Sequence, residues 1–265
     1  MTGRSPSAGM VHVPRKRFGQ HFLHDPGTIA KIVGAVDPRP DDVLVEIGPG
    51  LGALTGRLLE GAPRLVAIEI DRDLAAGLEA VHPSLTVHCG DVLEFDFGQL
   101  PEGLRVVGNL PYNVSTPLLF RLASYAARLR DVHVMLQREV VDRMVARPST
   151  SEYGRLSVML QYRFAIAKLF DVRPGAFRPP PKVDSAFVRM VPLPASALAA
   201  RDEPGLARVV TTAFTRRRKQ LRNALADVIG ESELRALGID PQLRPENLSV
   251  ADYVAIANAV DLANT

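Results

Sequence analysis

The sequence predicts an α/β fold: a Rossmann-like domain built on a parallel sheet, followed by a smaller all-α domain. Three observations lead to this fold class. From about residue 41, short β-branched runs alternate with longer helical stretches, as in parallel strands joined by helices that cover both faces of a sheet. A glycine-rich turn at residues 46–52 joins the first run to the first helical stretch. After residue 194 the strand-like runs stop.

The strands of the first domain are predicted from short runs rich in Val, Ile and Leu. They are expected at residues 43–47, 65–70, 85–88, 104–107 and 132–136, with amphipathic helices at 54–59 and 74–80 between them. Strand character returns at Val183 and at residues 187–191. In a parallel sheet all carboxyl ends lie at one edge, so residues that follow these strands are expected to meet there.

The C-terminal part, residues 195–265, contains no clear strand and predicts four or five short helices. Ser249 and Asp252 form a capping-box pattern at the start of the last one. Residues 1–14 are rich in Ser, Gly and Pro and predict disorder. We therefore expect a tail at 1–14, a catalytic domain at 15–194 and a helical domain at 195–265.

The composition is that of an ordinary soluble globular protein, with 265 residues, 46% hydrophobic and 23% charged. No apolar run approaches the roughly 20 residues of a membrane span, and no signal-peptide pattern is present. A single cysteine, Cys89, excludes an intramolecular disulfide and a cysteine zinc site. His21 and His24 share a turn without a third ligand nearby. We expect a cytoplasmic protein with no metal.

The charge is unevenly distributed. Residues 41–100 carry eleven acidic residues against three arginines, a net charge of −8, whereas the whole chain carries +3. The remaining sequence is therefore strongly basic, which indicates a polyanionic partner for that part. A surface simply solvated by arginines is the alternative.

The glycine turn indicates a nucleoside cofactor. Gly48, Gly50 and Gly52 follow a predicted strand, and glycine lets the backbone turn tightly and approach a ligand closely. Glu69 ends the next strand about 20 residues later, where an acid accepts hydrogen bonds from ribose hydroxyls. Asp91 follows the third strand and is suited to accept from an adenine amine. Dehydrogenases and flavin enzymes share such turns, and a turn without a ligand is a further alternative.

The segment Asn109-Leu110-Pro111-Tyr112 indicates a site for an amine to be alkylated. It follows the predicted fourth strand, where an open sheet binds ligands. The Asn109 side-chain oxygen and the Leu110 carbonyl can accept both hydrogens of an adenine amine, which aims the nitrogen lone pair at a methyl donor. Pro111 stiffens the turn, and Tyr112 can stack on the base. A purely structural turn is the alternative.

A second wall of that pocket is predicted at residues 177–182, Phe-Arg-Pro-Pro-Pro-Lys. Three successive prolines make a rigid loop. Phe177 at its head is suited to cover the other face of the base. Alternatively, Phe177 is a core residue and the prolines only link two elements.

Two basic segments are candidate RNA-binding sites. One comprises Arg15, Lys16 and Arg17, and the other comprises Arg216, Arg217, Arg218, Lys219 and Arg222. Such clusters neutralise backbone phosphates without reading sequence. No acidic residue interrupts the second cluster, which favours RNA contact over a solvated helix face.

Taken together, these motifs resemble the ribosomal RNA adenine dimethyltransferases, most closely their small-subunit branch. The resemblance extends over about residues 15–260. It is carried by residues 17–25, 46–55, 90–92, 109–113 and 175–187, and by the C-terminal segments 217–225 and 244–249.

The resemblance implies a class I methyltransferase domain that dimethylates two adjacent adenosines in a hairpin near the 3′ end of small-subunit RNA. It implies S-adenosylmethionine bound by His21, Leu23, Gly48, Gly50, Glu69, Ile70, Asp91, Val92 and Asn109. It also implies Tyr112 and Phe177 around the target base, a C-terminal domain that contacts the ribosome, and a role in small-subunit maturation. The family usually has asparagine where this chain has His21, so only a backbone contact is expected there. We expect a monomer whose partner is the small ribosomal subunit.

Three alternatives remain. A large-subunit methyltransferase of the macrolide-resistance type shares the fold, the cofactor and Asn109, but the C-terminal segments argue against it. A ribosome-assembly factor that acts mainly by binding is a second, and the intact segment 109–112 favours chemistry instead. A nicotinamide dehydrogenase is the most distant, because no acid–base residue for hydride transfer is visible.

Overall fold

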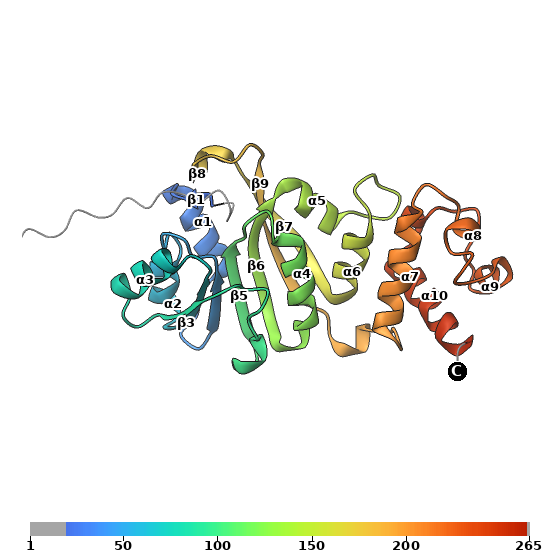
Figure 1. Ribbon diagram of the computed structural model, residues 1–265, viewed down its shortest axis with the longest axis horizontal. Helices are drawn as coiled ribbons and strands as arrows, with labels where there is room; N and C mark the ends of the chain where they lie inside the picture. The colour runs from blue at the N-terminus through green and yellow to red at the C-terminus, as the bar shows by residue number, and fades with distance from the viewer. Residues whose placement is uncertain (1–19, 264–265) are drawn as a thin grey trace, which may run out of the picture.

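The computed structural model describes residues 20–263. The predicted tail at 1–14 and the basic residues Arg15, Lys16 and Arg17 lie outside the described part. The sheet runs through the blue, green and yellow part of the chain, and the last helices form a group beyond it (Figure 1). No helix among the described residues is both long and apolar enough to cross a membrane.

A seven-stranded sheet forms the centre of the molecule, in the order β4-β3-β2-β5-β6-β9-β7. The bounds are β2 (Val43–Ile47), β3 (Arg64–Glu69), β4 (Thr86–Cys89), β5 (Leu104–Asn109), β6 (Leu129–Gln137), β7 (Phe164–Val172) and β9 (Ser185–Pro192). The strands β4, β3, β2, β5 and β6 pair in parallel, whereas β9 is antiparallel to both β6 and β7. All five predicted strands before residue 137 are confirmed.

The sheet is mixed, not wholly parallel, and β7 was not predicted at all. Its sequence, Phe-Ala-Ile-Ala-Lys-Leu-Phe-Asp-Val, contains several good helix formers and directly follows a helix. The predicted strand character at Val183 is wrong: β9 begins at Ser185, and Val183 is 47% exposed in the loop before it.

The order of the strands places a ligand-binding position beside β2. From β2 the chain continues to β3 on one side, and it later returns to β5 on the other side. At such a switch point the connecting loops diverge and leave a crevice at the carboxyl ends of the strands. The glycine turn follows β2, and Asn109 ends β5, so both predicted motifs lie at this crevice.

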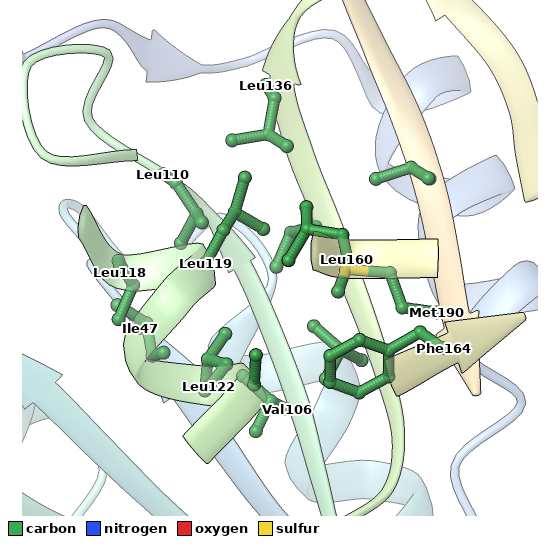
Figure 2. Close-up of a cluster of buried hydrophobic side chains, with 14 of the residues drawn as sticks. Ile47, Val106, Leu110, Leu118, Leu119, Leu122, Leu136, Leu160, Phe164 and Met190 are labelled. Carbon is green, nitrogen blue, oxygen red and sulfur yellow. The ribbon is translucent and has the colours of Figure 1, made fainter. Parts of the chain in front are cut away.

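Six helices accompany the sheet: α1 (Pro26–Val36), α2 (Thr55–Gly61), α3 (Arg72–Val81), α4 (Ser115–Ser124), α5 (Arg138–Val145) and α6 (Arg155–Arg163). Neighbouring residues of β2 and β5 belong to different cores: Leu44 and Val107 to one, Val45 and Val106 to the other. The strands are therefore buried on both faces. Figure 2 shows one face, where leucines of α4, Leu160 of α6 and Val106 of β5 belong to one cluster.

The C-terminal helices α7 (Glu203–Thr215), α8 (Leu221–Ala224), α9 (Glu231–Ala236) and α10 (Val250–Ala263) enclose a third core. Helix α6 contributes to two cores, with Leu160 in the core beside the sheet and Val158 in the helical one. The predicted capping box is confirmed, because the Ser249 amide donates to Asp252 Oδ2 (2.8 Å) and the Asp252 amide donates to Ser249 Oγ (3.1 Å).

Two short strands form a separate ribbon that covers the crevice. They are β1 (Phe22–Leu23) and β8 (Phe177–Arg178), paired antiparallel. This ribbon brings the N-terminal segment and the proline-rich loop, more than 150 residues apart in sequence, to the same side of the cofactor turn.

Candidate active site

A cavity opens at the carboxyl ends of β2, β3 and β5, with about 1100 Å³ of open space that is partly continuous with solvent. The predicted cofactor residues all line it: His21, Leu23, Gly48, Gly50, Glu69, Ile70, Asp91, Val92 and Asn109. The predicted methyl-accepting residues Leu110, Pro111 and Tyr112 line it as well. The fold thus brings five separate segments of the sequence into one site.

The glycine turn is built from backbone conformations that favour glycine. Gly48, Gly50 and Gly52 have φ values of +65°, +60° and +80°. A Cβ at Gly50 would lie 3.0 Å from the Phe22 ring, which closes this side of the cavity. The Gly50 amide donates to Glu69 Oε2 (3.1 Å), so the turn is tied to the end of β3.

Glu69 is a buried acceptor at the edge of the cavity. Its Oε1 accepts from the Asp71 amide (3.0 Å) while Oε2 accepts from Gly50. Burial raises the pKa of Glu69, and the neighbouring Asp71 carboxylate adds to this, although the backbone donors oppose it. A buried carboxyl group with remaining acceptor capacity is well suited to bind neutral hydroxyl donors.

Asp91 and Val92 present a polar and an apolar group side by side. Asp91 Oδ1 accepts from the Leu93 amide (2.8 Å), which orients the carboxylate. Val92 is buried and belongs to the sheet core, yet it also lines the cavity. This pair can bind a flat heterocycle through one edge and one face.

Asn109 is oriented by a single hydrogen bond. Its Nδ2 donates to the His21 carbonyl (2.9 Å), which leaves Oδ1 as the acceptor. The following turn is closed by the Val114 amide, which donates to the Pro111 carbonyl (3.2 Å). The carbonyl of Tyr112 accepts from Ser115 Oγ (3.0 Å) at the start of α4.

Tyr112 is held by its hydroxyl and its ring. The hydroxyl lies 2.8 Å from Ser185 Oγ at the start of β9. Its ring centroid lies 5.6 Å from that of His21, with the planes tilted by 31°. Burial raises the pKa of Tyr112, so the phenol stays neutral at ordinary pH.

The comparisons with known proteins match this arrangement. The sequence pattern of the family "Ribosomal RNA adenine dimethylase" covers residues 11–262. The chain belongs to this family. It is 61% identical over 251 residues to the ribosomal RNA small subunit methyltransferase A of Aromatoleum aromaticum, covering 94% of this chain and 95% of that protein. The identity to the protein of the same name from Chromobacterium violaceum is 58% over 250 residues, covering 93% and 95%.

Two solved structures share the fold. A dimethyladenosine transferase from Plasmodium falciparum superposes with a TM-score of 0.80 at 26% identity, covering 89% of this chain and 96% of that one. The 23S rRNA methyltransferase ErmE superposes with a TM-score of 0.68 at 27% identity, covering 91% and 99%. The Rossmann-like class I methyltransferase fold is therefore confirmed, and the chain is an S-adenosylmethionine-dependent adenine dimethyltransferase.

His21 has a defined place in this dimethylase. Its carbonyl accepts from Asn109 Nδ2, and its ring Nδ1 lies 2.8 Å from the Pro179 carbonyl. The side chain thus points to the proline-rich loop. The family usually has asparagine at this position. A contact between the His21 backbone and the cofactor stays a prediction.

Phe177 lies elsewhere than expected. It is 2% exposed and packs in the core that contains Leu23, and it is not among the residues that line the cavity. Phe177 pairs with Leu23 across the β1–β8 ribbon, and directly opposed residues project to the same face of a ribbon. That face is turned to the core. In this conformation Phe177 presents no surface to a base, and its contact with the base remains only a prediction.

Four residues of the C-terminal basic cluster, Arg216, Arg217, Arg218 and Lys219, line a hollow where α7 meets α8, with about 920 Å³ of open space. Arg216 pairs with Asp227 (3.0 Å), Arg217 lies 3.5 Å from Glu246, and Arg222 lies 4.0 Å from Glu231. Arg218 and Lys219 have no carboxylate within ion-pair distance among residues 20–260, whose side chains the structure describes. Within the cluster, Arg218 and Lys219 are therefore free to bind an anion, whereas the charges of the other three arginines are partly neutralised.

Several site residues escaped the sequence analysis. Glu46, 1% exposed inside β2, accepts from Thr55 Oγ1 (2.7 Å), and burial raises the pKa of Glu46 to about 7. A lone acid in the run Val-Leu-Val-Glu-Ile was the available signal. Phe22 and Ser185 lie in segments that carry the family resemblance but were not predicted as site residues, because long-range pairing gives them their positions. No group of three metal-ligating side chains is present among the described residues.

Proposed function

We propose that this chain dimethylates the exocyclic amines of two adjacent adenosines in a hairpin near the 3′ end of small-subunit ribosomal RNA. The observation that carries the proposal is the hydrogen bond from Asn109 Nδ2 to the His21 carbonyl. It commits the amide nitrogen and presents Oδ1 as an acceptor at the wall of a cavity suited to a nucleoside cofactor.

The hydrogen-bond acceptors and the apolar residues that line the cavity fit S-adenosylmethionine. Glu69 would accept from the ribose hydroxyls, Asp91 from the adenine amine, and Val92 with Ile70 would pack on the ring. A residue larger than glycine does not fit at position 50, because its Cβ would collide with the Phe22 ring. Leu23, Gly48 and the His21 backbone complete this wall. When bound, the cofactor supplies a methyl group on a sulfonium.

At the other end of the cavity, the protein binds and orients the target amine. Asn109 Oδ1 and the Leu110 carbonyl accept its two hydrogens, which aims the lone pair along the line of methyl transfer. Pro111 limits the motion of this turn, and Tyr112 stacks on the base. Fixed dipoles perform the catalysis, and no strong base is required.

The choice of the small subunit rests on relatives 58–61% identical that carry that name. The large-subunit enzyme ErmE shares only 27% identity. On this proposal the enzyme acts in the cytoplasm, as a monomer, during small-subunit maturation. Arg218 and Lys219 would contact the ribosome together with residues 15–17.

The test is transfer of labelled methyl groups to unmethylated small subunits, with large-subunit RNA as the comparison. We expect label in small-subunit RNA only. Label confined to large-subunit RNA would move the chain to the resistance type, and binding to the small subunit without any transfer would favour an assembly role.

A further inference from the structure

The two faces of the β1–β8 ribbon carry different pairs of side chains. Leu23 and Phe177 oppose each other and lie in the core. Phe22 and Arg178 also oppose each other, one residue along each strand, so they project to the other face. Phe22 and Leu23 both line the cavity, but it is the Phe22 ring that lies against the glycine turn, 3.0 Å from where a Cβ at Gly50 would stand. Arg178 shares the face of Phe22, and its side chain is exposed.

The loop that follows Arg178 is fixed to the catalytic segment at both ends. At one end the Pro179 carbonyl lies 2.8 Å from His21 Nδ1, and His21 also holds Asn109. At the other end Ser185 Oγ lies 2.8 Å from the Tyr112 hydroxyl. Three prolines restrict the backbone between these points. A loop held in this way binds a ligand with little loss of conformational entropy.

The charges on this loop are unbalanced. Arg178 and Lys182 are exposed, and no carboxylate among residues 20–260 lies within ion-pair distance of either. The only acid nearby in sequence, Asp184, is neutralised by Arg138 (3.0 Å). The carboxyl groups of Glu69 and Asp91 line the cavity itself. The cavity lining is thus acidic, whereas the loop is basic.

We propose that residues 178–182 form an RNA-binding lip, in which Arg178 and Lys182 bind the phosphates that flank the extruded adenosine. The lip deepens the proposed function and rests on it. The acidic lining of the cavity repels the RNA backbone and suits a cationic methyl donor, whereas the basic loop attracts the backbone. An adenosine whose phosphates are bound at the lip is then presented beside Asn109 and Tyr112, which are tied to the same loop.

The test is the salt dependence of RNA binding by Arg178→Gln combined with Lys182→Gln, which keeps side chains of similar length. Binding to a hairpin RNA with two adjacent adenosines is followed by fluorescence anisotropy from 0.05 to 0.5 M salt. Loss of two phosphate contacts should lower the log–log slope by about 1.4, at about 0.7 per single-stranded contact. If both proteins bind the RNA equally at 1 M salt, the variant should bind it about 25-fold more weakly than the wild type at 0.1 M salt. Affinity for S-adenosylmethionine should not change.

Two matched variants serve as controls. Arg178→Lys with Lys182→Arg keeps both charges and should keep the slope. Arg64→Gln removes an exposed cation at the amino end of β3, away from the cavity, and should also keep it. A double glutamine variant that binds S-adenosylmethionine normally and keeps the wild-type slope would overturn the lip while leaving the proposed function intact. A wild-type chain that methylates no ribosomal RNA would overturn the proposed function, and the lip with it.

Discussion

Replacing Asn109 with alanine removes two interactions at the methyl-accepting end of the cavity. One is the hydrogen bond from Nδ2 to the His21 carbonyl, 2.9 Å long and partly buried. Its loss should lower the free energy of unfolding by about 1 kcal/mol, as for a neutral hydrogen bond. The other is the acceptor Oδ1, which the proposal assigns to the amine in the transition state.

The magnitude of the catalytic effect follows from that second interaction. Removing one preorganised dipole aimed at developing charge costs about 100- to 1000-fold in rate, or about 3–4 kcal/mol. We therefore expect single-turnover methyl transfer by Asn109→Ala to fall by about that factor at saturating S-adenosylmethionine. Binding to the small subunit should remain near normal, because the basic surfaces are untouched.

Asn113 supplies the matched control, since it lines the same cavity four residues further on and its side chain is exposed. Asn113→Ala should keep transfer within about threefold of the wild type, a change below about 1 kcal/mol. Transfer by Asn109→Ala within the same range would refute the assigned role. Loss of subunit binding together with activity would refute it as well, because it would indicate a general loss of structure.

Three further predictions concern other parts of the molecule. Glu69→Gln should weaken S-adenosylmethionine binding about tenfold or more, measured by calorimetry, because a charged acceptor contributes about 1.5–3 kcal/mol. Glu46 has a folded pKa of about 7 against an ordinary value of 4.5, so its contribution to stability is full below about pH 4.5 and is lost as the pH rises to about 7. That shift is worth about 3 kcal/mol, and denaturant unfolding at pH 5 and 7.5 should show a smaller difference in Glu46→Gln than in the wild type. Arg217→Ala should lower the free energy of unfolding by about 1 kcal/mol, because Arg217 also donates to the Ser151 carbonyl (2.7 Å), whereas Arg218→Ala should instead weaken RNA binding.

Exposed residues of the same type provide the controls. Glu79→Gln, on α3, should leave cofactor affinity unchanged, and Glu60→Gln, on α2, should leave the pH dependence unchanged. Equal cofactor affinity in the Glu69 variant, or the wild-type pH dependence in the Glu46 variant, would contradict the respective assignment. An equal loss of stability in Arg217→Ala and Arg218→Ala would contradict the different roles assigned to these two arginines.

The parts of the fold with local signals were predicted well. The strands from β2 to β6 are short apolar runs separated by helices, and the glycine turn and the capping box are contiguous patterns. Strand β7 was missed because its residues also favour a helix, and only pairing with β9 decides between the two. Local sequence patterns thus predict β2 to β6 and the glycine turn, whereas β7 depends on tertiary pairing.

The same distinction applies to the site. Gly48, Asp91 and Asn109 line the cavity and were predicted because they lie at or just after the carboxyl ends of strands. His21 and Leu23 were named only through the family resemblance. The burial of Phe177 depends on the register with Leu23, which no local pattern specifies. Likewise, the partners of Arg216 and Arg217 lie 11 and 29 residues away in sequence, so pairing with Asp227 and Glu246 was not foreseen from an uninterrupted basic run.

The most direct test of the central claim is nucleoside mass spectrometry of small-subunit RNA after incubation of unmethylated subunits with this chain and S-adenosylmethionine. We predict N6,N6-dimethyladenosine at two adjacent positions near the 3′ end. Methylation at another atom or in large-subunit RNA, or no modified adenosine at all, would contradict it.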